Sequence, residues 1–265
     1  VLGSRGLGDV YKRQVIQLGA KILGINPAFP QEKREELCQV YGVDFCYQTE
    51  DIHYLAVKAL HEHNADFTKA ATMTLTSGST GLPKAVVHNV SAHLANAEGV
   101  FALMNFGKDQ SWLLSLPLYH VSGQGIVWRW LYAGATLVLP KEDFYQSIGE
   151  VSHVSLVPTQ LQRWFDYLVE HPQPIQTQAV LLGGTQIPVK LTQALSELGI
   201  RSYSGYGMTE MASTAFAKQS DGKIGVGQPL LGREFKLVNE EVWLKGAGLA
   251  MGYWRDGWVD QLTNA

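Results

Sequence analysis

The sequence contains little cysteine and no long apolar run. Only Cys38 and Cys46 occur among its 265 residues. Two thiols are too few for a disulfide framework and favour the reducing cytoplasm, although an oxidised pair is compatible with the same count. No apolar run approaches the roughly 20 residues that span a bilayer. The composition therefore argues against a disulfide-rich secreted domain and a membrane-spanning protein, and predicts a cytoplasmic one.

The chain also lacks an excess of charge of either sign. Charged residues make up 17% of the sequence, and the formal net charge is −3 at pH 7. This balance gives no support to a nucleic-acid partner or an anionic membrane surface. Apolar residues make up 46%, which indicates a globular chain with a buried core. The oligomeric state is left open.

Both ends of the chain lack the features of a natural domain boundary. Residues 1–14 have no initiator methionine and nothing that pairs with the pattern beginning at Val15. They also lack the apolar segment of a secretory signal. We expect this segment to be unmatched, whether it is native or artificially joined. The last residues stop without a cap or a closing strand, so we expect the chain to be a fragment truncated at both ends.

Strand-like and helix-like segments alternate from Val15 to about Lys218. The apolar and β-branched runs that predict strands cover residues 71–76, 112–120, 135–140, 153–158, 179–184 and 200–207. Apolar residues at helical spacing predict helices over residues 31–41, 91–104 and 187–198. Ser91 is the expected N-cap of the second helix. This alternation predicts an α/β fold with largely parallel sheets flanked by helices.

After Lys218 the helical pattern stops. Asn239 and Glu240 lie between two runs of alternating apolar residues, as in a β-hairpin. We therefore divide the chain into the unmatched residues 1–14, a partial α/β nucleotide-binding domain at 15–218, and the start of a small β subdomain at 219–265.

A polar loop, TSGSTGLPK, follows the predicted strand at residues 71–76. Its small residues leave backbone N–H groups unshielded, and Lys84 adds a positive charge, so the loop suits a phosphate group. It lacks the Gly-Lys-Ser/Thr ending of a Walker A loop, and Pro83 prevents it from leading straight into a helix. We expect a phosphate site between a strand and a helix. The alternative is an ordinary surface turn.

Together with its flanks, TLTSGSTGLPKAVVH resembles the phosphate-loop signature of the AMP-forming adenylating superfamily, which includes the acyl-CoA synthetases. SGYGMTE resembles the aromatic-Gly-x-Thr-Glu motif of that superfamily, LLGGTQIP its adenine-side glycine pair, and SLPLYHVSG its Pro-Leu-aromatic-His segment. The block from Trp112 to Ala135 is similar to the o-succinylbenzoate–CoA ligase family of menaquinone synthesis. The resemblance covers about Leu18 to Trp258.

The resemblance implies a two-step ligation that uses ATP, Mg²⁺ and coenzyme A. A carboxylate becomes an acyl-adenylate and then a CoA thioester. The residues implied for the β- and γ-phosphates are Thr76, Ser77, Gly78, Ser79, Thr80, Gly81 and Lys84. The implied catalytic residues are Lys84, His120, Thr209 and Glu210. Glu210 would also be the Mg²⁺ ligand, because a hard cation prefers carboxylate oxygen.

The resemblance also implies an adenine pocket and an acyl pocket. The further nucleotide-binding residues are Gly183, Gly184, Ser204, Gly205, Tyr206, Gly207 and Thr209. Tyr206 would stack on adenine. The residues expected beside the acyl group are His120, Ser122, Gln124 and Arg129. Arg129 lies in an aromatic run and is the candidate partner for the second carboxylate of the substrate, whereas the alternative is an arginine packed at a rim.

Two further functions are compatible with the same residues. The first is another acyl- or aryl-CoA synthetase with a different acid, and the second is a non-catalytic nucleotide-binding module. The resemblance further implies an Asp-containing ribose segment and a C-terminal domain with a catalytic lysine, neither of which this sequence contains. We therefore expect the chain alone to bind nucleotide weakly at most.

Overall fold

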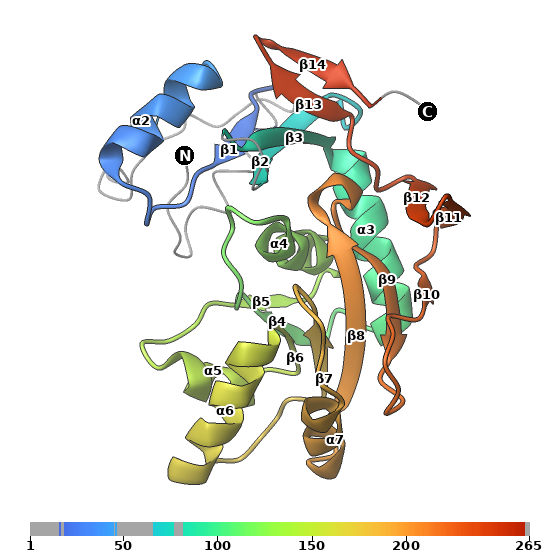
Figure 1. Cartoon of the computed structure of the whole chain (residues 1–265). Coiled ribbons are helices and arrows are strands. Elements are labelled where there is room, and N and C mark those ends of the chain that lie inside the picture. Colours follow the sequence, from blue (N-terminus) through green and yellow to red (C-terminus); the bar gives the residue numbers. More distant parts are fainter. Residues whose placement is uncertain (1–15, 17–18, 45, 47–65, 77–81, 263–265) are drawn as a thin grey trace.

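The computed structural model describes residues 16, 19–44, 46, 66–76 and 82–262 (Figure 1). Its strands are β1 (Ile22–Gly24), β2 (Ala70–Thr76), β3 (Lys84–Asn89), β4 (Ser111–Leu113), β5 (Thr136–Val138), β6 (His153–Leu156), β7 (Ala179–Leu182), β8 (Arg201–Met208), β9 (Ser213–Gln219), β10 (Gln228–Pro229), β11 (Arg233–Val238), β12 (Glu241–Gly246), β13 (Gly252–Arg255) and β14 (Trp258–Gln261). Its helices are α2 (Gln31–Val40), α3 (Val90–Met104), α4 (Val121–Ala133), α5 (Phe144–Gly149), α6 (Pro158–Glu170), α7 (Val189–Glu197) and the 3₁₀ helix η2 (Thr209–Met211).

The larger sheet has seven strands in the order β10-β9-β8-β7-β6-β4-β5. Pairing is parallel from β8 to β5, and β9 and β10 add antiparallel strands at one edge. Alternate residues of β7 show why the apolar run AVLL is continuous. Val180 and Leu182 pack with α5, α6 and α7, whereas Ala179 and Leu181 pack with α3 and α4. Both faces of the sheet are covered, so every position of a central strand is buried.

The smaller sheet has five strands in the order β1-β2-β3-β13-β14. Its pairs are antiparallel except for β1 with β2. Figure 1 shows this sheet above the seven-stranded sheet, with α4 between them. The α/β class predicted from the sequence is confirmed, with mixed sheets in which parallel pairing is concentrated in the larger one.

The polar loop joins two antiparallel strands. Thr76 at the end of β2 pairs with Lys84 at the start of β3. The predicted step from strand to helix was wrong, because Lys84 to Asn89 first form a strand and α3 begins only at Val90. The predicted N-cap Ser91 was also wrong. The cap is Asn89, whose side-chain oxygen accepts a hydrogen bond from the Ala92 N–H at 2.8 Å.

Residues 219–262 contribute to three sheets. β10 extends the larger sheet, β11 and β12 form a two-stranded ribbon, and β13 and β14 extend the smaller sheet. The predicted hairpin is confirmed, because Asn239 and Glu240 connect β11 to β12 with φ of 49° and 67°. The division of the chain at residue 218 into two units stays a prediction.

Three further findings concern the sequence predictions. Cys38 and Cys46 are both free thiols. Within the described part of the chain, no helix is both long enough and apolar enough to cross a membrane. The run DIHYLAVKALHEHN at residues 51–64, whose sequence suits a surface helix, lies outside the described residues.

Candidate active site

The predicted site residues gather where the larger sheet faces the smaller one. Gly183 and Gly184 follow β7, and Thr209 and Glu210 follow β8, so both pairs lie at the carboxyl ends of parallel strands. This edge is where open α/β sheets bind ligands. A side-chain hydrogen bond joins α4 to the smaller sheet here, from Gln124 Nε2 to Thr74 Oγ1 of β2 at 3.1 Å.

The ends of the polar loop are described, but Ser77, Gly78, Ser79, Thr80 and Gly81 lie outside the described residues. Thr76 Oγ1 donates a hydrogen bond to the Lys84 carbonyl at 3.4 Å. The Tyr41 hydroxyl donates to the carbonyl of Pro83, and the Trp254 indole donates to the Tyr41 carbonyl at 3.1 Å. The described end of the loop at Pro83 is therefore held by the residue that caps α2 and, through it, by β13.

Lys84 and Glu210, which are far apart in the sequence, contact the same side chain. The Lys84 ammonium lies 5.2 Å from the centre of the Tyr253 ring. The Tyr253 hydroxyl donates a hydrogen bond to Glu210 Oε1 at 3.1 Å. Lys84 and the Thr209–Glu210 pair are thus connected through one tyrosine side chain.

The glycine pair and the β8 motif line a second part of this edge. Gly184 has φ of +87°, a conformation that favours glycine, and a Cβ on Gly183 would meet the Gly205 carbonyl at 3.6 Å. Tyr206 is 46% exposed, and its ring lies 6.1 Å from that of Phe216 at an angle of 55°. Ser204 is buried, with its hydroxyl 2.9 Å from that of Ser220.

Gly207 has a packing role. A Cβ at this position would lie 1.9 Å from the Ser213 carbonyl oxygen. The absence of a side chain lets β9 pass close to the end of β8 where the pairing shifts register. This glycine of the motif is needed for the fold whether or not it also contacts a ligand.

His120 occupies the N-cap position of α4 and caps no backbone group with its side chain. Its side chain is exposed, and the ring lies 4.6 Å from that of Tyr119. Partial burial by neighbouring groups nevertheless lowers the pKa of the imidazole. A neutral imidazole is therefore favoured at neutral pH.

Arg129 is buried, with 2% of its surface exposed. Its guanidinium lies 5.1 Å from the centre of the Trp112 ring, and Nη1 donates a hydrogen bond to Ser155 Oγ at 3.4 Å. Burial, with a smaller contribution from the positive charge of Arg233, lowers the pKa of Arg129 to about 9, so it stays charged at neutral pH. Within the described ranges, no carboxylate forms an ion pair with it. The alternative of an arginine at an exposed rim was wrong.

The other predicted acyl-pocket residues lie on the first turns of α4. Ser122 is half-buried and Gln124 is buried. The Gln124 amide nitrogen also donates to the Leu118 carbonyl at 3.2 Å. Its buried Oε1 has no partner among the residues that the structure describes.

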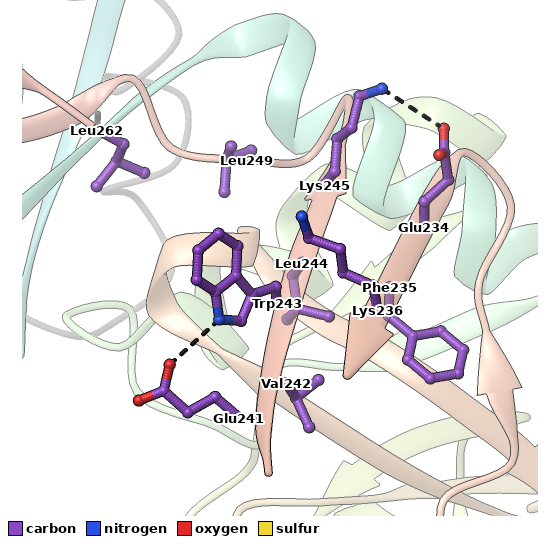
Figure 2. A pocket seen from close by; sticks show the side chains of 10 residues that line it. All are labelled: Glu234, Phe235, Lys236, Glu241, Val242, Trp243, Leu244, Lys245, Leu249 and Leu262. Carbon is purple, nitrogen blue, oxygen red and sulfur yellow. Dashed lines mark hydrogen bonds and ion pairs between the residues drawn. The ribbon is translucent and has the colours of Figure 1, made fainter. Parts of the chain in front are cut away.

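A hollow of about 700 Å³ lies elsewhere, beside the β11–β12 ribbon (Figure 2). Its lining residues are Glu234, Phe235, Lys236, Glu241, Val242, Trp243, Leu244, Lys245, Leu249 and Leu262. None of the predicted site residues is among them. The candidate site therefore lies apart from this hollow, where Tyr253 contacts both Lys84 and Glu210.

A profile of the AMP-binding enzyme family matches residues 15–254. The chain belongs to the AMP-binding enzyme family. The 2-succinylbenzoate–CoA ligase of Haemophilus influenzae is 66% identical over 250 residues, which are 94% of this chain and 55% of that protein. The Escherichia coli ligase of the same name is 48% identical over 260 residues, with 94% and 57% covered.

The fold also matches solved members of the AMP-binding enzyme family. An arginine-to-lysine variant of Escherichia coli MenE with bound OSB-AMS has a TM-score of 0.85 and 46% identity, and the match covers 97% of this chain and 59% of that chain. The chain thus spans just over half the length of the relatives it matches.

An AMP-binding enzyme of this kind is expected to use Mg²⁺, and the residues present fit that ion. Among the described residues, no group of three or more His, Cys, Asp and Glu side chains gathers to hold a metal. Mg²⁺ does not need such a cage, because it is commonly bound by one or two carboxylates together with substrate phosphates and water. The half-exposed Glu210 carboxylate offers such an oxygen ligand.

Sequence reasoning missed Tyr253, the residue that links Lys84 to Glu210 in this AMP-binding enzyme. It stands in the run GYW, which carries no polar signature of a site. Only the antiparallel pairing of β13 with β3 brings it to Lys84. The spacing of the sequence held no signal for this contact.

Proposed function

We propose that the natural protein containing this chain activates 2-succinylbenzoate with ATP, forming the acyl-adenylate, and then transfers the acyl group to coenzyme A. The observation that carries this proposal is the contact of Lys84 and Glu210 with one tyrosine, which unites two motifs for the same nucleotide tail. The Haemophilus influenzae and Escherichia coli relatives, both named 2-succinylbenzoate–CoA ligase, support the choice of acid.

The first step has an electrostatic barrier that this site is suited to lower. A carboxylate must approach the α-phosphorus of a polyanion, and negative charge must be stabilised on the departing pyrophosphate. Lys84, Thr76 and the residues of the polar loop would bind the β- and γ-phosphates. Thr209 would contact the α-phosphate, and Glu210 would hold Mg²⁺, which neutralises phosphate charge when bound.

The adenine and the reacting carboxylate would lie along the carboxyl ends of β7 and β8. The exposed ring of Tyr206 would stack on adenine, and Gly183 and Gly184 would let the nucleotide approach the backbone. His120, at the start of α4, would orient the incoming carboxylate. The lowered pKa of His120 favours a hydrogen-bonding role for the neutral ring.

Arg129 would bind the second carboxylate of the substrate, with Gln124 and Ser122 as polar neighbours. A buried guanidinium is costly unless an anion pairs with it, and no such anion comes from the described residues. A dicarboxylate that reaches this depth would supply the missing charge. The partner is therefore a small-molecule carboxylate, while a cytoplasmic location stays a prediction.

The test is ATP–pyrophosphate exchange by the natural protein. We expect exchange that depends on added 2-succinylbenzoate, and Lys84→Ala should lower its rate about 100-fold because a transition-state contact is lost. Exchange driven equally well by unrelated acids would favour another acyl- or aryl-CoA synthetase. ATP binding without any exchange would favour a non-catalytic nucleotide-binding module.

Arg129 has its own test in the same assay. Arg129→Ala should raise the KM for 2-succinylbenzoate at least about 10-fold, with a much smaller effect on benzoate, since only the dicarboxylate loses an ion pair. Arg129→Lys keeps the charge, so its KM for 2-succinylbenzoate should lie between those of the unsubstituted protein and Arg129→Ala. Arg163→Ala, at an exposed arginine, is the matched control. Equal losses on both acids would contradict the assignment.

A further inference from the structure

The side chain of Tyr253 stands between two elements that the proposed function assigns to the same triphosphate. β13 pairs with β3 in antiparallel register, with Tyr253 opposite Val86 (Figure 1). Paired residues of a sheet share a face, and so do residues two apart on one strand. Tyr253 and Lys84 are therefore diagonal neighbours on one face, which explains the 5.2 Å between the Lys84 ammonium and the ring centre.

The other end of the tyrosine reaches η2. Its hydroxyl donates to Glu210 Oε1 at 3.1 Å. Among the described residues, no other group donates a hydrogen bond to this carboxylate. A carboxylate oxygen can only accept, so the phenol is the donor in this bond.

The backbone before Tyr253 holds the same elements together. The Ala250 N–H donates to the Glu210 carbonyl at 2.8 Å, and the Met251 N–H donates to the Val87 carbonyl at 2.9 Å. Residues 250–253 thus bridge β3 and η2 through main-chain bonds. Because the backbone already provides this connection, the Tyr253 side chain is available for orienting charged groups.

We propose that Tyr253 is a positioning residue that sets the Glu210 carboxylate for Mg²⁺ and the Lys84 ammonium for phosphate at a defined spacing. The hydroxyl occupies one lone pair of Oε1 and leaves the rest of the carboxylate to the metal. The ring face attracts the ammonium and limits its rotation. This inference rests on the proposed function, since it assumes that the site binds ATP with Mg²⁺.

Two variants of the natural protein test the role of the Tyr253 hydroxyl and the role of its ring separately. Tyr253→Phe removes the hydroxyl and keeps the ring, whereas Tyr253→Leu removes both. Tyr132→Phe is the matched control, because Tyr132 near the C-terminal end of α4 also interacts with a glutamate, Glu98 of α3. ATP affinity is measured by calorimetry with Mg²⁺ and with EDTA, beside the thermal midpoint of each variant.

We expect Tyr253→Phe to weaken ATP binding about 10-fold with Mg²⁺ and less than about 2-fold with EDTA, because a group that orients a metal ligand is lost. Tyr253→Leu should weaken binding in both conditions, and Tyr132→Phe in neither. If Mg²⁺ strengthened ATP binding by Tyr253→Phe as much as by the unsubstituted protein, this inference would be overturned but the proposed function would stand. The same holds if Tyr253→Phe lost equal ATP affinity with Mg²⁺ and with EDTA and had a lower thermal midpoint. No ATP binding by the unsubstituted protein would overturn the proposed function as well.

Discussion

At the scale of single residues, a residue that belongs to a nucleotide-binding motif can also be required by the packing of the fold. Gly207 belongs to the run that suggested nucleotide binding, yet its neighbours explain it without a ligand. The Ser213 carbonyl occupies the space where a side chain would begin. Arg129 is the opposite case, because packing alone does not explain a buried cation without an anion.

The packing role of Gly207 predicts a large loss of stability in Gly207→Ala. The added methyl would overlap the backbone of β9, which cannot move aside as a flexible side chain can, so we expect a loss of about 3 kcal/mol in urea unfolding. Gly107→Ala is the control, since a Cβ there would meet nothing within 4 Å. It should change stability by less than about 1 kcal/mol. Similar effects of the two substitutions would contradict this account.

At the scale of elements, the start of α3 depends on the strand before it. β3 ends at Asn89, and the same residue caps the helix by accepting from the Ala92 N–H. Ser91 lies inside the first turn, and its hydroxyl donates instead to the Phe67 carbonyl at 3.2 Å. The strand that leaves the polar loop therefore leads directly into the helix that packs on the larger sheet.

Asn89→Ala should destabilise the protein by about 1 kcal/mol, because an N–H of the first turn loses its acceptor. Asn89→Asp keeps an oxygen acceptor and should stay within about 0.5 kcal/mol of the unsubstituted chain. Chemical denaturation with both variants at one pH measures the difference. An aspartate as harmful as the alanine would show that the side chain does not act as the cap.

At the scale of the whole molecule, two buried histidines link stability to pH. His88 in β3 and His153 in β6 are both fully buried, one in each main sheet. Burial lowers the pKa of each to about 4. For His88 a contact with the Glu210 backbone opposes the shift in part, and for His153 the charge of Arg201 adds to it. In the unfolded chain both would titrate near 6.5.

Because the folded pKa lies below the unfolded one, these histidines stabilise the protein fully above about pH 6.5 and lose that effect as the pH falls towards 4. Between pH 7.5 and 5.5 the two together should lower the free energy of unfolding by roughly 2–3 kcal/mol. Urea unfolding at both pH values measures the loss. His153→Phe should reduce it by about half, and the exposed His171→Asn should leave it unchanged. A loss that His153→Phe does not alter would contradict this assignment.

Local patterns predicted much of the fold. The apolar run of β7, the helical spacing of α7 and the Asn239–Glu240 turn each depend on neighbouring residues, and each was found where the sequence predicted it. The same holds for the α/β class, because alternating periodicities determine which faces must be buried. The helix predicted at residues 91–104 was also found, as α3, but the strand β3 that precedes it and pairs with β2 was not predicted, and the predicted cap Ser91 was wrong.

The sequence by itself determined the family motifs and the alternation of strand and helix patterns, since these depend on residue types at short spacing. Only the tertiary structure decided that β3 pairs with β13, which brings Tyr253 to both Lys84 and Glu210. It also decided that Arg129 is buried against Trp112. The physical reason is that strand pairing and burial depend on contacts between distant segments, and local periodicity carries no information about which segments meet.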